Sequence, residues 1–353
     1  MNIQEYKNYL LSQASLYNKK VSEKLVTTMQ ENGILSIAPE MIEEYKKNYK
    51  IVIINSIRKL EMETIKILEE WEYIKNYQYS VLYQIDSNKI SNLDKKLKEL
   101  NLTCFDINSK EAEVLYPVVH MPTYMDDDEK IIFKFSLKKE GFRPSGDEIK
   151  VKYPIIAVLF KESGILEIRY DSINGMLVDD YKQFYKKNIG SIKAWFSTKL
   201  GIKAEKIDIY DTVKNIYESG EVNLGGQDMR FSNGSKACLE VGSDNSYTLP
   251  LLGELKEIIK QNEEEFNQCL NLRQLLETWI KGKEDEADCV WICLCWPDAQ
   301  NRKTYEVRVR FVFDYFEEDE TLLYHYSGVI GMERMNDVTR TIIKHLPGHQ
   351  ATE

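Results

Sequence analysis

The hydrophobic pattern between residues 153 and 201 changes its period once, and this change limits the folds that the chain can adopt. Residues 155–160 are a continuous apolar run of strand length, and residues 165–170 alternate between apolar and charged side chains. The loop between these runs ends in Gly164, and glycine accepts the positive φ of a hairpin. After the second run, apolar residues recur at the spacing of a helix. The pattern predicts two antiparallel strands and a helix that packs on them.

The predicted helix, residues 178–200, carries its own start and stop signals. Asp180 suits the N-cap, and Gln183 follows it at the capping-box position. Gly201 suits the left-handed residue that ends a helix. Large apolar and aromatic side chains share one face of this helix, and burying each of them stabilises a fold by roughly 2 kcal/mol. We interpret this face as core and not as a ligand site.

Strict alternation in residues 130–138 predicts a third strand just before the other two. Phe133 and its alternate neighbours form an apolar face. Lys134 and Lys138 fall on the other face, which we expect to be solvated and cationic. The module is therefore a meander of three strands followed by a helix.

A second meander is predicted nearer the C-terminus. Its strands are residues 289–296, 304–316 and 321–331, and residues 337–346 form a short helix after them. Between the two meanders, Asn233-Gly234 is flanked by strand-like runs and predicts a two-residue hairpin turn.

The fold class that follows is α+β: a helical N-terminal region followed by two modules of antiparallel three-strand meander plus helix. An acidic run at residues 122–129 and a glycine-rich passage at residues 220–226 predict two domain boundaries. The predicted domains are a mainly helical N-terminal domain (1–121), a basic βββα central module (130–218) and an acidic α+β C-terminal module (227–348).

Composition indicates the cellular compartment in which such a protein is expected. No apolar run approaches the roughly 20 residues of a membrane-spanning helix. The first residues also lack the basic and apolar segments of a secretory signal. Six cysteines without dense spacing predict reduced thiols. We therefore expect a cytoplasmic protein with no membrane partner.

Charge is distributed unevenly along the chain. The net charge is −10, yet residues 130–206 contain 16 Lys and Arg against 9 Asp and Glu. Clustered cations bind phosphate backbones because each neutralised phosphate releases counterions. Alternatively, the cations form a solvated face that meets the acidic remainder of the same chain. The residues predicted to bind nucleic acid are Lys134, Lys138, Arg143, Lys150, Lys152, Lys182, Lys186 and Lys193.

Other charged or thiol-bearing motifs favour structural roles. The cysteines of residues 289–296 lie on a strand and not on a turn, so core packing is favoured over a zinc site. Glu167 and Arg169, with Asp147 upstream, depart from the acid-x-Lys pattern of magnesium-dependent nucleases, and a charge pair is favoured. The sequence predicts no catalytic residue, no metal site and no cofactor.

We expect a non-catalytic nucleic-acid-binding protein that acts as a subunit of a larger assembly, with DNA or RNA as its partner. Richness in Lys, Ile, Asn and Tyr is typical of AT-rich bacterial genomes and suggests a mobile-element or host-defence component. Two alternatives stay open. One is a protein-protein interaction subunit whose basic module docks an acidic protein partner or a second copy of itself, giving a homo-oligomer. The other is a metal-dependent nuclease effector.

Overall fold

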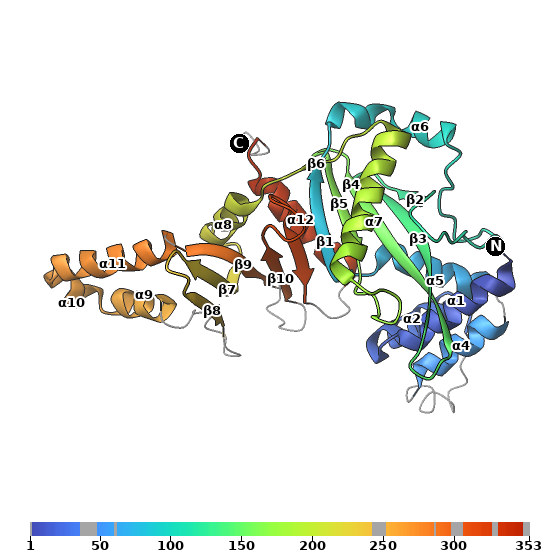
Figure 1. The fold of residues 1–353 in the computed structure, drawn as a ribbon, viewed down its shortest axis with the longest axis horizontal. Coiled ribbons are helices and arrows are strands. Elements are labelled where there is room, and N and C mark those ends of the chain that lie inside the picture. Colours follow the sequence, from blue (N-terminus) through green and yellow to red (C-terminus); the bar gives the residue numbers. More distant parts are fainter. Residues whose placement is uncertain are drawn as a thin grey trace. The chain divides into compact units, whose positions relative to one another are not determined.

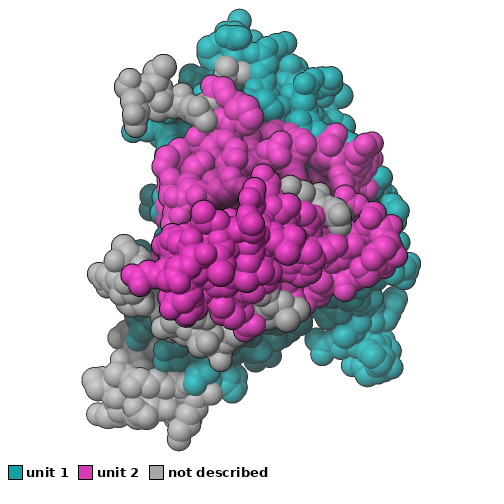
Figure 2. Space-filling model, turned by 90° about the vertical axis from the view of Figure 1, so that its left-hand side faces the viewer, with its two compact units in different colours: residues 1–206, 329–335 teal, residues 207–328, 336–353 magenta. Residues whose placement is uncertain are grey.

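The chain forms two compact units, coloured teal and magenta in Figure 2. Unit 1 consists of residues 1–206 and 329–335, and unit 2 of residues 207–328 and 336–353. Each unit combines helices with antiparallel strands, so the α+β prediction is confirmed. The residues that the computed structural model describes are 2–35, 48–59, 62–241, 252–285, 287–297, 306–326 and 331–348.

The sheet of unit 1 is built around the predicted meander. Its strands are β1 (Tyr79–Gln84), β2 (Thr123–Asp126), β3 (Lys130–Phe142), β4 (Glu148–Phe160), β5 (Ile165–Tyr170) and β6 (Glu205–Lys206). Their order is β2-β3-β4-β5-β1, with antiparallel neighbours, and β6 pairs with β1. Gly164 takes a φ of 68° in the loop between β4 and β5. The meander β3-β4-β5 is therefore confirmed.

Helix α7 (Tyr181–Trp195) and the π-helical turn η3 (Phe196–Leu200) lie on one face of this sheet (Figure 1). The helix begins as predicted, because the Asp180 side chain accepts a hydrogen bond from the backbone N–H of Gln183 at 3.0 Å. Gly201 ends η3 with a φ of 67°, in the left-handed region.

Aromatic side chains join this helix to the sheet. The ring centroid of Phe133 lies 5.2 Å from that of Phe196, and the centroid of Phe135 lies 5.4 Å from that of Trp195. Both pairs meet edge to face. This arrangement stabilises the packing by about 0.5–1.5 kcal/mol beyond the contribution of the buried area. Since side chains of a strand alternate, Lys134 points to the opposite face.

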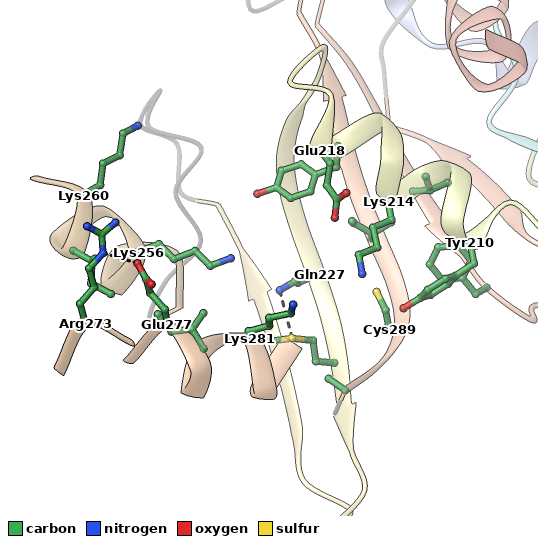
Figure 3. A pocket seen from close by; sticks show the side chains of 18 of the residues that line it. Tyr210, Lys214, Glu218, Gln227, Lys256, Lys260, Arg273, Glu277, Lys281 and Cys289 are labelled. Carbon is green, nitrogen blue, oxygen red and sulfur yellow. Dashed lines mark hydrogen bonds and ion pairs between the residues drawn. The ribbon is translucent and has the colours of Figure 1, made fainter. Parts of the chain in front are cut away.

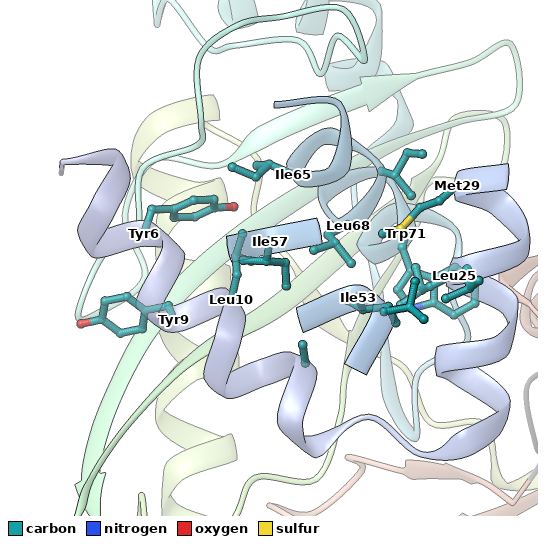
Figure 4. Packing of buried hydrophobic residues seen from close by; sticks show 14 of the residues in the cluster. Tyr6, Tyr9, Leu10, Leu25, Met29, Ile53, Ile57, Ile65, Leu68 and Trp71 are labelled. Atoms are coloured by element: carbon teal, nitrogen blue, oxygen red, sulfur yellow. The ribbon is translucent and has the colours of Figure 1, made fainter. Parts of the chain in front are cut away.

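That opposite face is covered by N-terminal helices. They are α1 (Ile3–Leu16), α2 (Lys19–Glu31), α4 (Tyr49–Lys59) and α5 (Met62–Ile74). Helix α1 lies along β4, and α5 contacts β3 through the Lys134 side chain. Figure 4 shows Leu10, Ile57 and Leu68 meeting between these helices, and Trp71 is buried beside them. The sheet of unit 1 is thus covered on both faces. The turn η2 (Ser87–Asn92) and helix α6 (Leu93–Glu99) follow β1.

Unit 2 repeats the plan of a meander followed by a helix. Its strands are β7 (Asn223–Phe231), β8 (Lys236–Glu240), β9 (Ala287–Trp296), β10 (Val307–Val312) and β11 (Leu322–His325), in the order β11-β10-β9-β7-β8. Its helices are α8 (Tyr210–Glu218), α9 (Leu252–Gln261), α10 (Glu263–Gln268), α11 (Leu270–Asp285) and α12 (Met332–His345), of which the first four residues of α12 belong to unit 1. Gly234 has a φ of 82° between β7 and β8, as the hairpin prediction requires.

The boundary between the units differs from the predicted domain boundaries. Residues 122–129 do not form a linker, because they contain β2, which pairs with β3. The N-terminal helices and residues 130–206 of the basic module therefore share one unit. Residues 220–226 are not a boundary either, because α8 and β7 on both sides of them belong to unit 2. Parts of the predicted strands 304–316 and 321–331 lie outside the described residues. Of the helices that the structure describes, none has the length and apolar character needed to cross a membrane.

Candidate functional site

Two of the lysines predicted to bind nucleic acid lie inside unit 1. The side chains of Lys134 and Lys152 are 0% exposed. The strand alternation behind the prediction is correct, but the expectation of a solvated outer face is wrong, because α1 and α5 cover that face. No phosphate backbone can reach these two ammonium groups without unfolding the N-terminal helices.

Two glutamates neutralise the two buried lysines. Glu72 lies 3.0 Å from Lys134 Nζ and 2.5 Å from Lys152 Nζ. Glu113 lies 2.9 Å from Lys134 Nζ and also pairs with Lys152. Burial alone would raise the pKa of Glu113, but the two ammonium groups outweigh it and hold that pKa at about 2. The balanced cluster therefore joins α5 and the chain at residue 113 to the sheet, and it has no surface for a ligand.

The other six predicted residues do not gather on one surface. Lys150 pairs with Glu148 at 3.1 Å, and Lys193 lies over the ring of Tyr83 at 4.2 Å. By strand alternation Lys138 belongs to the face of Lys134, whereas Lys182, Lys186 and Lys193 belong to α7 on the opposite face. Arg143 is exposed in the loop between β3 and β4, and Lys182 is exposed on α7. The expectation that these cations point outward together is therefore wrong.

A pair of cations that the prediction left out lies on the α7 side. Lys139 Nζ lies 4.9 Å from the ring centroid of Phe184. Burial lowers the pKa of Lys139, and the charge of Lys187 lowers it further. The sequence could have placed Lys139 on the α7 side, because strand alternation puts it on the same face as Phe133 and Phe135.

Two further motifs have the structural roles that the sequence favoured. Arg169 donates to Glu167 at 2.6 Å, and both side chains are 0% exposed, so the charge pair is confirmed. Cys293 and Cys295 are buried in unit 2, as expected for core cysteines. Among the residues that the structure describes, no three His, Cys, Asp or Glu side chains are grouped so that they could hold a metal ion.

Unit 2 contains a cavity of about 660 Å³, called the unit 2 cavity below. Strands β7 and β9 contribute Gln227, Met229, Cys289 and neighbouring residues, α8 forms one wall, and α9 with α11 forms the other (Figure 3). Its volume falls within the roughly 300–1,000 Å³ of typical ligand sites. Its charged lining residues are Lys214, Lys256, Lys260, Arg273, Lys281, Glu218, Glu263 and Glu277.

Helical spacing explains why α8 and α11 can supply these side chains. On α8, Tyr210, Lys214, Tyr217 and Glu218 are three or four residues apart or adjacent, and they share one face. On α11, the cavity residues also recur every three or four positions and include Lys281. Each helix thus turns a mixed polar and apolar face toward the cavity.

The electrostatics of the unit 2 cavity favour an anion. Arg273 is held by Glu277 at 2.8 Å and by Glu263 at 3.4 Å. By contrast, the ion pairs found within the described ranges include neither Lys214 nor Lys281. Figure 3 shows the side chains of Lys256 and Lys281 reaching toward Gln227, and that of Lys214 ending beside Cys289. Like charges that converge in one cavity repel one another, and a bound anion relieves that repulsion.

The thiol in this cavity is not prepared for nucleophilic chemistry. Burial raises the pKa of Cys289 to about 11, and the nearby charge of Asp228 contributes to the shift. The thiolate is the reactive form of cysteine, and at neutral pH almost all of this thiol is protonated. Cys289 therefore acts as a small packed side chain beside the lysines.

Sequence reasoning missed the unit 2 cavity because the predicted boundary at residues 220–226 separated α8 from the strands beside it. It also missed the cavity because the C-terminal module is acidic in total, and this total hides the cations that line the cavity. Cations that converge from α8, α9 and α11 are far apart in the sequence, and no local motif records them. No known protein family matches this chain, and no curated protein is detectably similar to it.

Proposed function

We propose that this protein is a non-catalytic nucleic-acid-binding protein and that the unit 2 cavity is its binding site. The observation that carries the proposal is the convergence of Lys214, Lys256 and Lys281 on one cavity. Phosphate is the anion that nucleic acids present, and lysine binds it as a compact point charge. The protonated Cys289 supports a binding role over a nucleophilic one. A role within a larger assembly, in a mobile element or in host defence, is part of the proposal and rests on composition alone.

Titration of a fluorescent oligonucleotide at several salt concentrations tests this proposal. Binding that uses phosphate contacts weakens as salt rises, by a logarithmic slope of about 0.7 for each contact with a single strand. Replacing Lys214 and Lys281 by Met removes two cations from the cavity. We expect weaker binding and a slope that is smaller by roughly one to two.

The matched control is Lys95→Met, because this lysine is 79% exposed on α6 in unit 1. It should leave both the affinity and the slope unchanged. If the cavity variant and the control bind equally, the unit 2 cavity is not the nucleic-acid site.

Self-association is a second candidate function, and a specific surface favours it. On α11, Leu272, Leu275 and Trp279 are 50%, 66% and 51% exposed. Their spacing of three and four residues places them in one stripe along the helix. Beside this α11 stripe lie Asn271 and Thr278, which are uncharged. This candidate is independent of the unit 2 cavity and is tested by oligomeric state.

A further inference from the structure

Two tyrosines on the α8 wall of the unit 2 cavity keep much of their surface exposed. Tyr210 is 38% exposed and meets the ring of Phe313 edge to face at a centroid distance of 4.8 Å, and Tyr217 is 41% exposed, although both tyrosines line the cavity. They are seven residues apart, so they lie on the same side of α8 with a separation of roughly 10 Å along its axis. Lys214 lies between them on that side. Helix α8 therefore presents an aromatic ring, a cation and a second aromatic ring in series.

Single-stranded nucleic acid presents the matching series of groups. Unpaired bases stack on aromatic side chains, and the phosphate that links two nucleotides carries a negative charge between their bases. We infer that the unit 2 cavity binds a short single-stranded segment, with neighbouring bases at Tyr210 and Tyr217 and the linking phosphate at Lys214. This inference rests on the proposed function and specifies the class of nucleic acid.

The second wall supplies partners for the same backbone. Lys281 of α11 and Gln227 of β7 also line the cavity, and Figure 3 shows their side chains and that of Lys214 reaching into it from different elements. Both are hydrogen-bond donors, and phosphate oxygens are acceptors only. A strand that enters the cavity is therefore held from two sides.

The geometry separates a single strand from the other forms of nucleic acid. In a B-form duplex the bases stack on one another and show only their edges, in grooves roughly 12 Å and 6 Å wide. Tyrosine rings on a helix wall cannot stack on such bases. A mononucleotide has one base and leaves one of the two tyrosines without a stacking partner.

The test uses the full chain and fluorescence anisotropy. The probes are labelled ten-nucleotide single strands of DNA and of RNA, the duplex of the same DNA sequence, and adenosine monophosphate as competitor. We expect at least one single strand to bind tenfold or more tightly than the duplex. We also expect adenosine monophosphate to compete at least tenfold less well than the unlabelled strand.

Substitution of Tyr217 tests the stacking directly. Tyr217→Leu should weaken single-strand binding roughly tenfold, because base stacking on one aromatic side chain contributes on that order. It should leave the salt slope unchanged, since no charge is removed. Tyr217→Phe keeps the ring and should keep the affinity. The matched control is Tyr181→Leu in unit 1, where the tyrosine is 47% exposed, and it should have no effect.

Three results overturn the inference while nucleic-acid binding still stands. They are equal affinity for duplex and single strands, competition by adenosine monophosphate as strong as by the strand, and a Tyr217→Leu variant that binds like wild type. If none of the probes binds even at low salt, the proposed function itself is overturned.

Discussion

Glu113 shows how a single carboxylate can tie stability to pH. Its side chain is 5% exposed, yet Lys134 and Lys152 keep it ionised in the folded protein, with a pKa of about 2. In the unfolded chain a glutamate has a pKa of about 4.3. Between these two values the unfolded state binds more protons, so the free energy of unfolding falls as the pH falls.

We therefore expect the free energy of unfolding to decrease as pH is lowered from about 4.5 to about 2. Glu113→Gln should be less stable than wild type at pH 7 and should lose less stability between pH 7 and pH 3. Urea titrations at the two pH values measure this difference. Glu111→Gln, an exposed neighbour, serves as control and should follow wild type. Parallel losses for wild type and Glu113→Gln would contradict the assigned pKa.

Glu72 is the partner of both buried lysines, and removing its charge leaves them undercompensated. Breaking a buried ion pair by removing one partner costs about 3–5 kcal/mol. Glu72→Gln should lower the free energy of unfolding by about that amount, as measured by urea denaturation at pH 7. The control is Glu63→Gln on the same helix, where the side chain is exposed and the change should be within about 0.5 kcal/mol. Equal stability of the two variants would show that the ion pairs of Glu72 contribute little to the free energy of unfolding.

At the scale of elements, the sequence predicted the central meander and α7 well. The signals are local: alternation in β3, a glycine with positive φ before β5, and an Asp180 cap on α7. Which element covers each face of the sheet cannot be predicted from local sequence signals. The alternation of β3 shows that Lys134 lies opposite Phe133, but only the packing of α5 shows that its face is buried.

The sequence of α5 does contain one signal that this face of the sheet is buried. Glu69 and Glu72 stand three residues apart on the same face of α5 as Ile65 and Leu68, and a glutamate on such an apolar face requires a buried partner. The unit 2 cavity left a weaker trace. Its cations are spread over three helices, and a count of charge along the chain averages them with the many carboxylates of the same region. Prediction of such a site needs the relative placement of helices.

The α11 stripe makes a prediction about assembly. Exposed Leu275 lies within the stripe, so a charge placed there should oppose contact with a second copy. Sedimentation velocity over a range of protein concentrations should show self-association of wild type and its loss in Leu275→Glu. Gln274→Glu adds the same charge on a neighbouring exposed position outside the stripe and should associate like wild type. A wild-type protein that stays monomeric at high concentration removes self-association as a candidate.

At the scale of the whole molecule, a chain with a net charge of −10 repels a polyanion at long range. Binding of nucleic acid by such a chain requires cations that are placed locally, and the described residues include two such groups. One is the unit 2 cavity with Lys214 and Lys281, and the other is the α7 side with Lys182 and Lys186. Substitutions in the two regions change the total charge by different amounts, so they separate a local site from a general effect of charge.

Replacing Lys182 and Lys186 by Glu lowers the net charge by four, whereas replacing Lys214 and Lys281 by Met lowers it by two. If total charge governed binding, the first variant would lose more affinity. We expect the opposite order, with the cavity variant losing more affinity, because its lysines converge on one ligand and each phosphate contact is short-ranged. Anisotropy titrations of both variants against the same labelled single strand, at one salt concentration, measure the order. A larger loss in the α7 variant would move the nucleic-acid site from the unit 2 cavity to unit 1.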